Sequence, residues 1–233
     1  PGLASGIRNR LSSPPPISLI YNAVDLEQLH PEATGGPAFL QAHGLPDDRR
    51  WITFLGGLGP HIDLETMLTA AAHFSGHDDV SFLFVGTGAQ KDKLLSVLKK
   101  PDYQHCHWIE WIGANEVPAF WAASTLHFWA LHDNPLDRLR MQAKAYEALS
   151  SGTPIAIAAE GFMADLLRDE GIGLAATAGD ADGLAQAIET LLADDEMRHD
   201  ISQRARNYAE AHHNPQQVIS RYEDILKQTA ASD

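Results

Sequence analysis

The sequence is poor in cysteine and contains no long hydrophobic run. Its 233 residues include a single cysteine, Cys106, which excludes a disulfide within the chain and fits a reducing compartment. No segment approaches the ~20 consecutive apolar residues that a membrane-spanning helix needs. We therefore expect a cytoplasmic protein without a direct membrane span.

Positive charge is scarce as well. The chain has 17 Lys and Arg residues against 31 Asp and Glu residues, which gives a net charge of −14. Such a surface repels polyanions, so neither nucleic acid nor anionic lipid is expected as the main partner. A small phosphorylated ligand is still compatible with this charge, because a glycine turn or a helix N-terminus binds phosphate locally.

Recognisable metal-binding patterns are also missing. The 12 histidines are scattered along the chain. His105 and His107 are close enough to share a metal ion, but no third ligand follows at a recognisable spacing. We expect no metal site and no obligatory metal cofactor.

What the sequence does contain is a regular alternation of short and long apolar patterns. Hydrophobic residues make up 44% of the chain, which is enough for a sizeable core. Short apolar runs rich in β-branched residues predict strands, and the segments between them have helical periodicity. The apolar runs lie at residues 17–21, 51–56, 80–86, 107–113, 125–131, 154–158 and 173–177. Two closing helices are predicted at residues 196–213 and 215–228.

This alternation predicts right-handed β-α-β crossovers and a mainly parallel sheet. The first 16 residues are rich in Gly, Ser and Pro, and we predict an inter-domain linker or junction over residues 1–30. Residues 31–233 are predicted to form a doubly wound α/β domain with a six-stranded Rossmann-like sheet and helices on both faces. Ligands of such sheets bind outside the carboxyl ends of the strands.

Two glycine turns stand at predicted strand ends. The first contains Gly56, Gly57 and Gly59, and the second contains Gly86 and Gly88. Glycine permits positive φ and lets backbone N–H groups approach a phosphate. Tight turns without any ligand explain the first group equally well, and neither a dinucleotide fingerprint nor a P-loop is present.

Two further places carry candidate ligand contacts. Trp111 and Ile112 close the run at 107–113, where they would either flank a flat ring or belong to the core. A helix is predicted from about Leu139 to Leu149, with Lys144 and Glu147 three residues apart on one side. The pair is either a solvated salt bridge worth ~0.2 to 0.5 kcal/mol or a ligand contact, in which Glu147 accepts hydroxyls and Lys144 meets negative charge. The residues alone leave both alternatives open.

A family resemblance extends from about residue 17 to residue 226. It is carried, in this order, by SLIYNAVDLEQLHP, FLGGLG, FLFVGTGAQKDKL, WIEWIGANEVPAFWAAS, AKAYEALSSGTPIAIAAEG and GIGLAATAGDADGLAQAIETLLAD. Together these motifs resemble the C-terminal, donor-binding half of GT-B glycosyltransferases, in particular the family-four (group 1) retaining enzymes. The pattern is most similar to the branch that makes bacterial surface polysaccharides.

The resemblance implies a nucleotide diphosphate sugar, either UDP- or GDP-linked, at the strand ends. In that family, the residue matching Glu147 binds the ribose hydroxyls, and the turn matching Gly56 to Gly59 lies by the diphosphate. The base would rest near Trp111 and Ile112. Asn134 is a candidate for sugar contacts. The acceptor, a sugar or a lipid-linked glycan, would be held by a missing N-terminal half. The isolated domain is therefore expected to transfer nothing. The full-length enzyme is expected at the inner face of the membrane if its acceptor is lipid-linked.

The chain departs from the family pattern at three positions. Gly57 and Ile62 stand where many members carry an arginine and a lysine that touch phosphate, and Leu139 stands where the family has its first glutamate. Lys144 is retained as a basic residue for the diphosphate, and with Glu147 it is the predicted catalytic pair. The departures favour one alternative, a catalytically degenerate GT-B module with a binding or structural role. A GT-B nucleotide-sugar epimerase is a further alternative that ranks last, because the usual acid and histidine constellation of such enzymes is not evident in the sequence.

Overall fold

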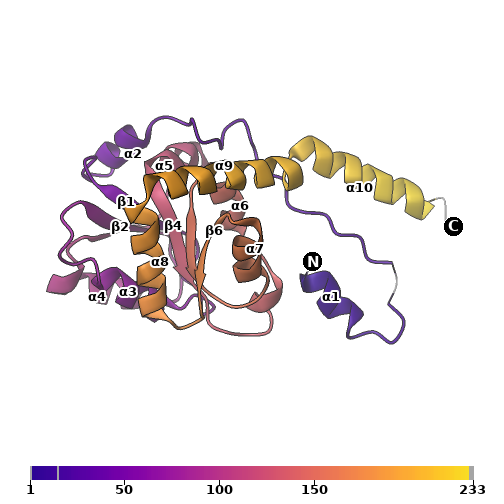
Figure 1. Cartoon of the computed structure of the whole chain (residues 1–233), viewed down its shortest axis with the longest axis horizontal. Helices are drawn as coiled ribbons and strands as arrows, with labels where there is room; N and C mark the ends of the chain where they lie inside the picture. The colour runs from indigo at the N-terminus through magenta and orange to yellow at the C-terminus, as the bar shows by residue number, and fades with distance from the viewer. Residues whose placement is uncertain (1, 15, 231–233) are drawn as a thin grey trace.

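The computed structural model describes residues 2–14 and 16–230 and shows a single six-stranded sheet (Figure 1). The strands are β1 (Arg50–Leu55), β2 (Val80–Val85), β3 (Cys106–Ile109), β4 (Ser124–Ala130), β5 (Ile155–Ala158) and β6 (Gly173–Ala176). All neighbouring strands pair in parallel, in the order β3-β2-β1-β4-β5-β6. This is the order of a doubly wound fold, and the winding reverses between β1 and β4. The predicted fold class is confirmed.

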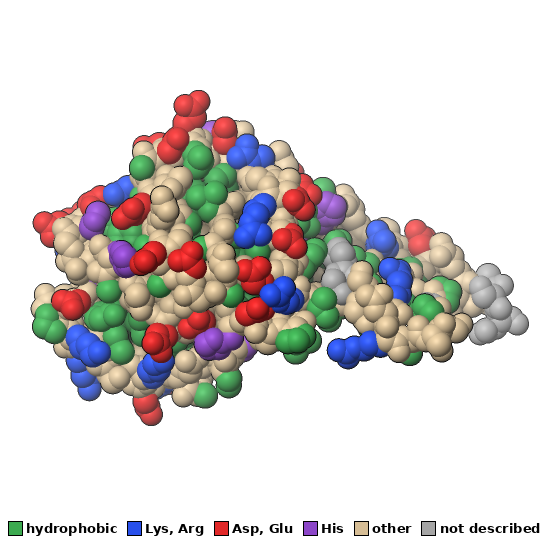
Figure 2. Space-filling view, turned by 60° about the horizontal axis from the view of Figure 1, so that its bottom comes forward, with side chains coloured by type: hydrophobic (Ala, Val, Ile, Leu, Met, Phe, Trp, Pro, Cys, Tyr) green, Lys and Arg blue, Asp and Glu red, His purple; other side chains and the backbone are tan. Residues whose placement is uncertain are grey.

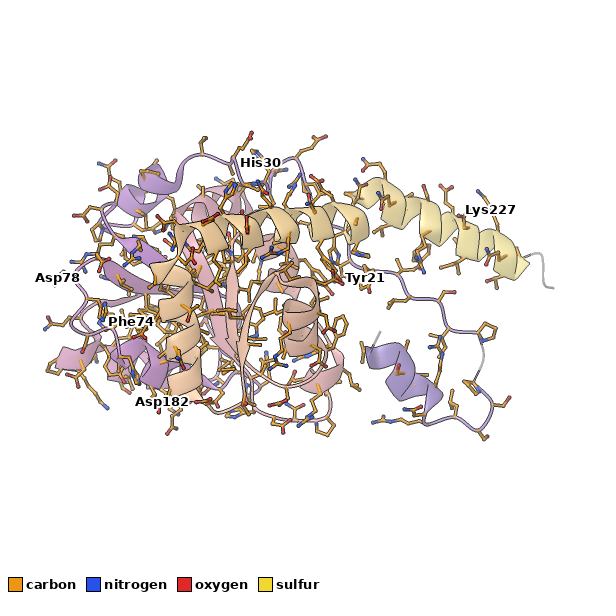
Figure 3. The ribbon with its side chains drawn as sticks, in the orientation of Figure 1. Tyr21, His30, Phe74, Asp78, Asp182 and Lys227 are labelled. Atoms are coloured by element: carbon orange, nitrogen blue, oxygen red, sulfur yellow. The ribbon has the colours of Figure 1, made fainter. Side chains whose placement is uncertain are left out.

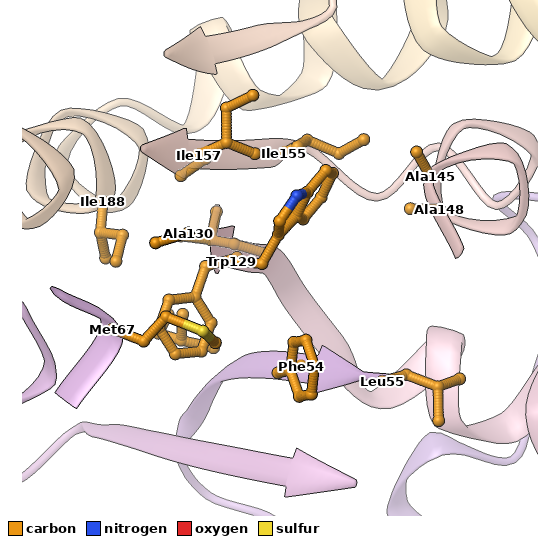
Figure 4. Close-up of a cluster of buried hydrophobic side chains, with 14 of the residues drawn as sticks. Phe54, Leu55, Met67, Trp129, Ala130, Ala145, Ala148, Ile155, Ile157 and Ile188 are labelled. Atoms are coloured by element: carbon orange, nitrogen blue, oxygen red, sulfur yellow. The ribbon is translucent and has the colours of Figure 1, made fainter. Parts of the chain in front are cut away.

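Helices cover both faces of the sheet. The α-helices of the described residues are α1 (Gly2–Arg8), α2 (Gly36–Ala42), α3 (Leu64–Ala72), α4 (Lys91–Leu98), α5 (Val117–Ala123), α6 (Ala143–Ser150), α7 (Phe162–Glu170), α8 (Ala181–Ala193), α9 (Asp195–His212) and α10 (Pro215–Ala230). Of these, α1 and α10 lie away from the sheet (Figure 1). Figure 4 shows Met67 of α3 and Ile188 of α8 on one side of β4, with Ala145 and Ala148 of α6 on the other. The sheet is therefore buried between two helical layers, which explains why every residue of β2 is apolar or fully covered.

Three sequence predictions differ from the structure. Residues 17–21 form no strand; Tyr21 packs instead against His212 and His213 at the end of α9, with ring centroids 5.8 and 5.4 Å apart (Figure 3). The strand predicted over residues 107–113 ends at Ile109. In the first run, Tyr21 packs against the end of α9 instead of pairing in the sheet. In the second run, residues 107–109 pair with β2, and Ile112 beyond the strand end is buried in the core.

The helix predicted from about Leu139 begins later, at Ala143. Asn134 is the physical reason, because its Oδ1 accepts hydrogen bonds from the backbone N–H groups of Leu136 and Asp137, at 3.1 and 3.0 Å. These bonds fold residues 137–139 into a separate 3₁₀ turn, η3 (Asp137–Leu139). The short helices α1 and α2 were not predicted. The division of the chain at residue 30 stays a prediction.

Arg206 of α9 joins three segments that are far apart in the sequence. Its guanidinium donates to the carbonyls of Leu26 and Leu29 in the N-terminal segment, at 3.1 and 2.7 Å. It also donates to the carbonyl of Ser150, the last residue of α6, at 2.9 Å. A cation at a helix C-terminus is favourable, so Arg206 anchors α6 to α9 and to the entry of the chain.

Helix α10 projects beyond the rest of the molecule (Figures 1 and 3). It exposes Ile219, Tyr222 and Leu226, each between 56% and 59% accessible. Within the described parts of the chain, no helix combines the length and the apolar character needed to cross a bilayer.

The face of the molecule that Figure 2 presents carries acidic side chains spread over it, with Lys and Arg side chains between them.

The turn after β1 and the turn after β2 lie backbone to backbone. The N–H of Gly56 donates to the carbonyl of Val85 at 3.0 Å, and the N–H of Leu58 donates to the carbonyl of Thr87 at 2.9 Å. A Cβ added at Gly86 would lie 1.9 Å from the carbonyl oxygen of Gly56, and the φ of Gly86 is 141°. Only glycine fits there without moving a backbone.

This contact predicts opposite outcomes for two alanine substitutions. Gly86→Ala should lower the free energy of unfolding by at least ~2 kcal/mol, because the methyl group meets backbone and the positive φ is strained. Gly57→Ala should change it by less than ~1 kcal/mol, because nothing lies closer than 4.0 Å to the added carbon. Urea denaturation of both variants measures the difference. Equal losses would contradict the account of the two turns.

Candidate functional site at the carboxyl ends of the strands

Two adjoining hollows open where β1 ends. We call them the Trp129 hollow, of about 410 Å³, and the Trp111 hollow, of about 330 Å³. They share Leu55, Gly56, Gly57 and Lys144. The hollows thus form one elongated two-part site beside the point where the winding of the sheet reverses, which is where doubly wound sheets bind ligands.

The glycines of the two turns differ in their relation to the hollows. Gly56 and Gly57 line both hollows, and Gly86 lines the Trp111 hollow. Gly88 is explained by packing alone, because a Cβ there would lie 2.6 Å from the carbonyl oxygen of Leu58. Gly59 presents its carbonyl to the side-chain amide of Gln90, which donates to it at 2.8 Å.

The Trp111 hollow has an apolar wall and an exposed aromatic ring. Ile112 is 5% exposed and Trp111 is 77% exposed, and both line this hollow. The ring of Trp111 is therefore not part of the core, which is one of the two alternatives for this residue, whereas Ile112 is buried. A flat apolar ligand group has both a buried side chain and an aromatic face to pack against here.

Lys144 and Glu147 contact each other, as their spacing predicts. The ammonium of Lys144 donates to Oε1 of Glu147 at 2.5 Å, and the indole N–H of Trp121 donates to Oε2 at 3.2 Å. The Glu147 side chain is 21% exposed, so the pair is only partly solvated. Lys144 lines both hollows, whereas Glu147 stands behind it and is not among the lining residues.

Arg140 enters the Trp129 hollow and was not predicted. It lies four residues before Lys144 in the segment DRLRMQAK, which is the only sequence signal for it. Its Nε donates to Oδ1 of the buried Asp137 at 2.7 Å. His61 lines the same hollow, and its pKa is lowered by burial and by the charge of Arg140. Two basic side chains therefore approach the hollow, Arg140 from the segment before α6 and Lys144 from the first turn of α6, and α6 adds the positive end of its dipole.

Asn134 is not among the residues that line either hollow. Besides accepting the two backbone hydrogen bonds that form η3, its amide donates to Asp137. The structure thus accounts for Asn134 through the loop it stabilises, and its predicted sugar contact stays a prediction. Among residues 2–14 and 16–230, no three His, Cys, Asp or Glu side chains gather as a metal site. The need for a metal also stays untested.

His127 of β4 forms part of the floor of the Trp129 hollow. Its ring is 2% exposed, and Nδ1 donates to the carbonyl of Thr53 at 2.8 Å. Burial lowers the pKa of His127 to about 3. The hydrogen bond to Thr53 raises this pKa by a smaller amount, and the charge of Lys144 lowers it further. The imidazole is therefore neutral, with Nε2 free of a proton.

This neutral histidine predicts a pH effect on stability. The unfolded chain takes up a proton at His127 near pH 6.5, but the folded chain does so only near pH 3. The free energy of unfolding should therefore fall as the pH drops from about 6.5 towards 3. Urea titrations at several pH values should show a weaker fall for His127→Asn than for the wild type. The exposed His199→Asn serves as the control, and an equal slope in all three proteins would refute this assignment.

Strand order and site geometry together define the class of protein. The chain is a doubly wound α/β domain with an elongated, partly basic, two-part ligand hollow at its switch point, which is the architecture of nucleotide-binding domains. Residues 37–208 match the family described as Glycosyl transferases group 1, and the chain belongs to this family.

Comparison with individual proteins agrees with this assignment. The chain is 25% identical over 211 residues to a putative glycosyltransferase, YtcC, of Bacillus subtilis (strain 168), a match that covers 83% of this chain and 50% of that protein. The chain thus spans about half the length of this curated relative.

Solved structures share the fold. Sucrose-phosphate synthase from Thermosynechococcus elongatus superposes with a TM-score of 0.83 at 20% identity, covering 100% of this chain and 57% of that one. The C-terminal domain of the group 1 glycosyl transferase LpcC from Francisella tularensis gives 0.70 at 17% identity, with coverages of 83% and 100%. Anabaena HepE in complex with UDP gives 0.76 at 18% identity, with coverages of 92% and 57%. The fold is that of the C-terminal half of GT-B glycosyltransferases, as the motifs predict.

Proposed function

We propose that this chain is the donor-binding domain of a retaining glycosyltransferase and holds a nucleotide diphosphate sugar across the two hollows. One observation carries the proposal: the hollows meet at Gly56, Gly57 and Lys144. A nucleotide sugar has a flat base at one end, a sugar at the other and a diphosphate between them. Its shape and charge match a two-part site whose junction carries glycine backbone and a lysine.

In this proposal the base lies in the Trp111 hollow. Ile112 and the exposed ring of Trp111 offer apolar surface for a flat ring. The diphosphate lies at the junction, where the backbone at Gly56 and Gly57 leaves room for close approach and Lys144 and Arg140 provide positive charge. These two cations are local, which reconciles anion binding with a net charge of −14.

Glu147 binds the ribose hydroxyls after an exchange of partners. Lys144 holds Oε1 of Glu147 in the structure, and Trp121 holds Oε2. When Lys144 turns towards a phosphate, Oε1 is released and accepts a ribose hydroxyl, while Trp121 keeps the carboxylate in place. The half-buried position of this pair supports a ligand contact over a merely solvated salt bridge.

The relatives support a nucleotide-sugar donor. Structures of Anabaena HepE were solved with UDP and with UDP-glucose. A further structural neighbour, WaaG, is described as a glycosyltransferase involved in lipopolysaccharide biosynthesis. We therefore propose transfer of a glycosyl group to a sugar or lipid-linked glycan acceptor, in polysaccharide or glycoconjugate synthesis, without an obligatory metal. The acceptor is held by residues outside this chain, so the isolated chain binds donor without transferring it.

Isothermal titration with UDP, GDP, UDP-glucose and GDP-mannose tests this proposal. The chain should bind one nucleotide series, and Lys144→Ala should weaken binding of the diphosphate by about tenfold or more, since a charged hydrogen bond is lost. Lys93→Ala is the matched control, because Lys93 is an exposed lysine of α4 paired with Glu65. Folded protein that binds neither series would refute the proposal.

A second substitution separates an active enzyme from a degenerate module. Glu147→Gln keeps the shape of the side chain but weakens its acceptance of hydroxyls, so the full-length protein should lose about tenfold or more in transfer rate. Activity of the full-length enzyme is measured by release of the nucleoside diphosphate. An unchanged rate would favour the degenerate alternative. Leu139 supports that alternative as well, because it lies near Gly6 of α1 and lines neither hollow.

A further inference from the structure

Two side chains that line the Trp129 hollow carry three buried polar atoms that lack a hydrogen-bond partner among the described residues. These atoms are the indole Nε1 of Trp129 and the amide Nε2 and Oε1 of Gln142. The other buried or half-buried indoles are satisfied: that of Trp51 donates to Pro46, that of Trp108 to Gly86 and that of Trp121 to Glu147. Trp129 is the exception, and it is 2% exposed.

Such atoms need a physical explanation, because each buried, unpaired polar group reduces stability. Gln142 holds the N-cap position of α6, yet its side chain caps no backbone N–H group. Its amide is therefore available for another partner. Three unpaired atoms thus belong to two residues from different parts of the chain that line one hollow, which points to a ligand that completes their hydrogen bonds.

The kinds of atom involved identify the chemistry of this ligand. The indole and the amide nitrogen donate hydrogen bonds, whereas the amide oxygen only accepts them. The diphosphate of a nucleotide sugar is esterified at both ends and offers only acceptors at neutral pH, so it would leave Oε1 of Gln142 unpaired. Hydroxyl groups both donate and accept, so a polyhydroxylated group satisfies all three atoms. The hollow also has aromatic walls from Phe54 and His127, against which the C–H faces of a sugar pack.

We propose that Trp129 and Gln142 form a specificity subsite for the hydroxyls of the glycosyl unit of the donor. This inference rests on the proposed function and names the part of the donor that fills the Trp129 hollow. Arg140 and Lys144 line the same hollow and supply the charge for the adjoining diphosphate. Trp129 and Gln142 take over sugar recognition in a chain that has Leu139 where related enzymes have a glutamate.

The two side chains lie in different surroundings. Figure 4 shows the indole of Trp129 beside Ile155 of β5 and facing the side of α6 that carries Ala145 and Ala148. These two alanines are fully buried and leave space for the ring. Gln142 is half-buried in an extended backbone just before α6, so its amide can turn towards a ligand without giving up a capping bond.

Two substitutions test the subsite. Trp129→Phe removes the N–H and keeps an aromatic wall, and Gln142→Leu removes the amide at similar size. Each variant is titrated with UDP, GDP, UDP-glucose and GDP-mannose, and the affinity for the nucleotide sugar is divided by that for its nucleoside diphosphate. Each substitution should lower this ratio by about fivefold or more, because hydroxyls lose a buried partner. The affinity for the nucleoside diphosphate alone should stay within about twofold.

Stability provides an independent readout. Trp51→Phe is the matched control, since it removes the indole N–H that donates to Pro46 far from the hollow. Trp51→Phe should lower the urea midpoint, whereas Trp129→Phe should lower it less or not at all, because its N–H is unpaired without ligand. A loss equal to that of Trp51→Phe would show a structural partner for Trp129 and overturn the inference.

The outcomes also separate this inference from the proposed function. Wild-type protein that binds none of the four ligands would overturn both. Wild-type protein that binds a nucleotide series, with an unchanged sugar-to-nucleotide ratio in both variants, would leave the proposed function standing and overturn only the subsite. In that case the unpaired atoms are bridged by ordered water instead.

Discussion

The backbone contact between the turn after β1 and the turn after β2 is the constraint on which the candidate site depends. The two turns continue the hydrogen bonding of β1 and β2 beyond the ends of both strands, and at Gly86 the distance leaves no room for a side chain. The result is a floor of bare backbone that both hollows share at Gly56 and Gly57. Backbone of this kind can meet an anion directly, and it is held by the sheet rather than by a mobile loop.

The basic groups above this floor are already paired. Lys144 is bound to Glu147 and Arg140 to Asp137, so the site has little net charge before a ligand arrives. An anionic ligand must therefore exchange with a carboxylate instead of entering a strongly positive pocket. Such an exchange favours ligands that satisfy both sides, with an anion for the cations and hydroxyls for the released carboxylate. A nucleotide diphosphate sugar carries both kinds of group, whereas inorganic phosphate carries only one.

The sequence predicts the sheet and much of the site because both follow from local periodicity and from the rule that parallel strands end at one edge. The approach of Gly56, Gly86, Ile112 and Lys144 is an example. The pattern misleads where an apolar run packs outside the sheet, as Tyr21 does against α9. Arg140, Trp129 and Gln142 could not be predicted as neighbours, because the path between β4 and α6 is set by side-chain hydrogen bonds in a loop, which have no periodicity.

The hydrogen bonds of Arg206 bear on how the chain folds during translation. Arg206 binds the carbonyl of Ser150 at the end of α6, 56 residues before it in the chain, and the carbonyl of Leu29, 177 residues before it. A polypeptide emerging from the ribosome completes its strands well before this arginine is available, since contacts of such sequence separation form late. The helix that carries Lys144 and Glu147 is thus anchored at its far end only once translation has reached α9.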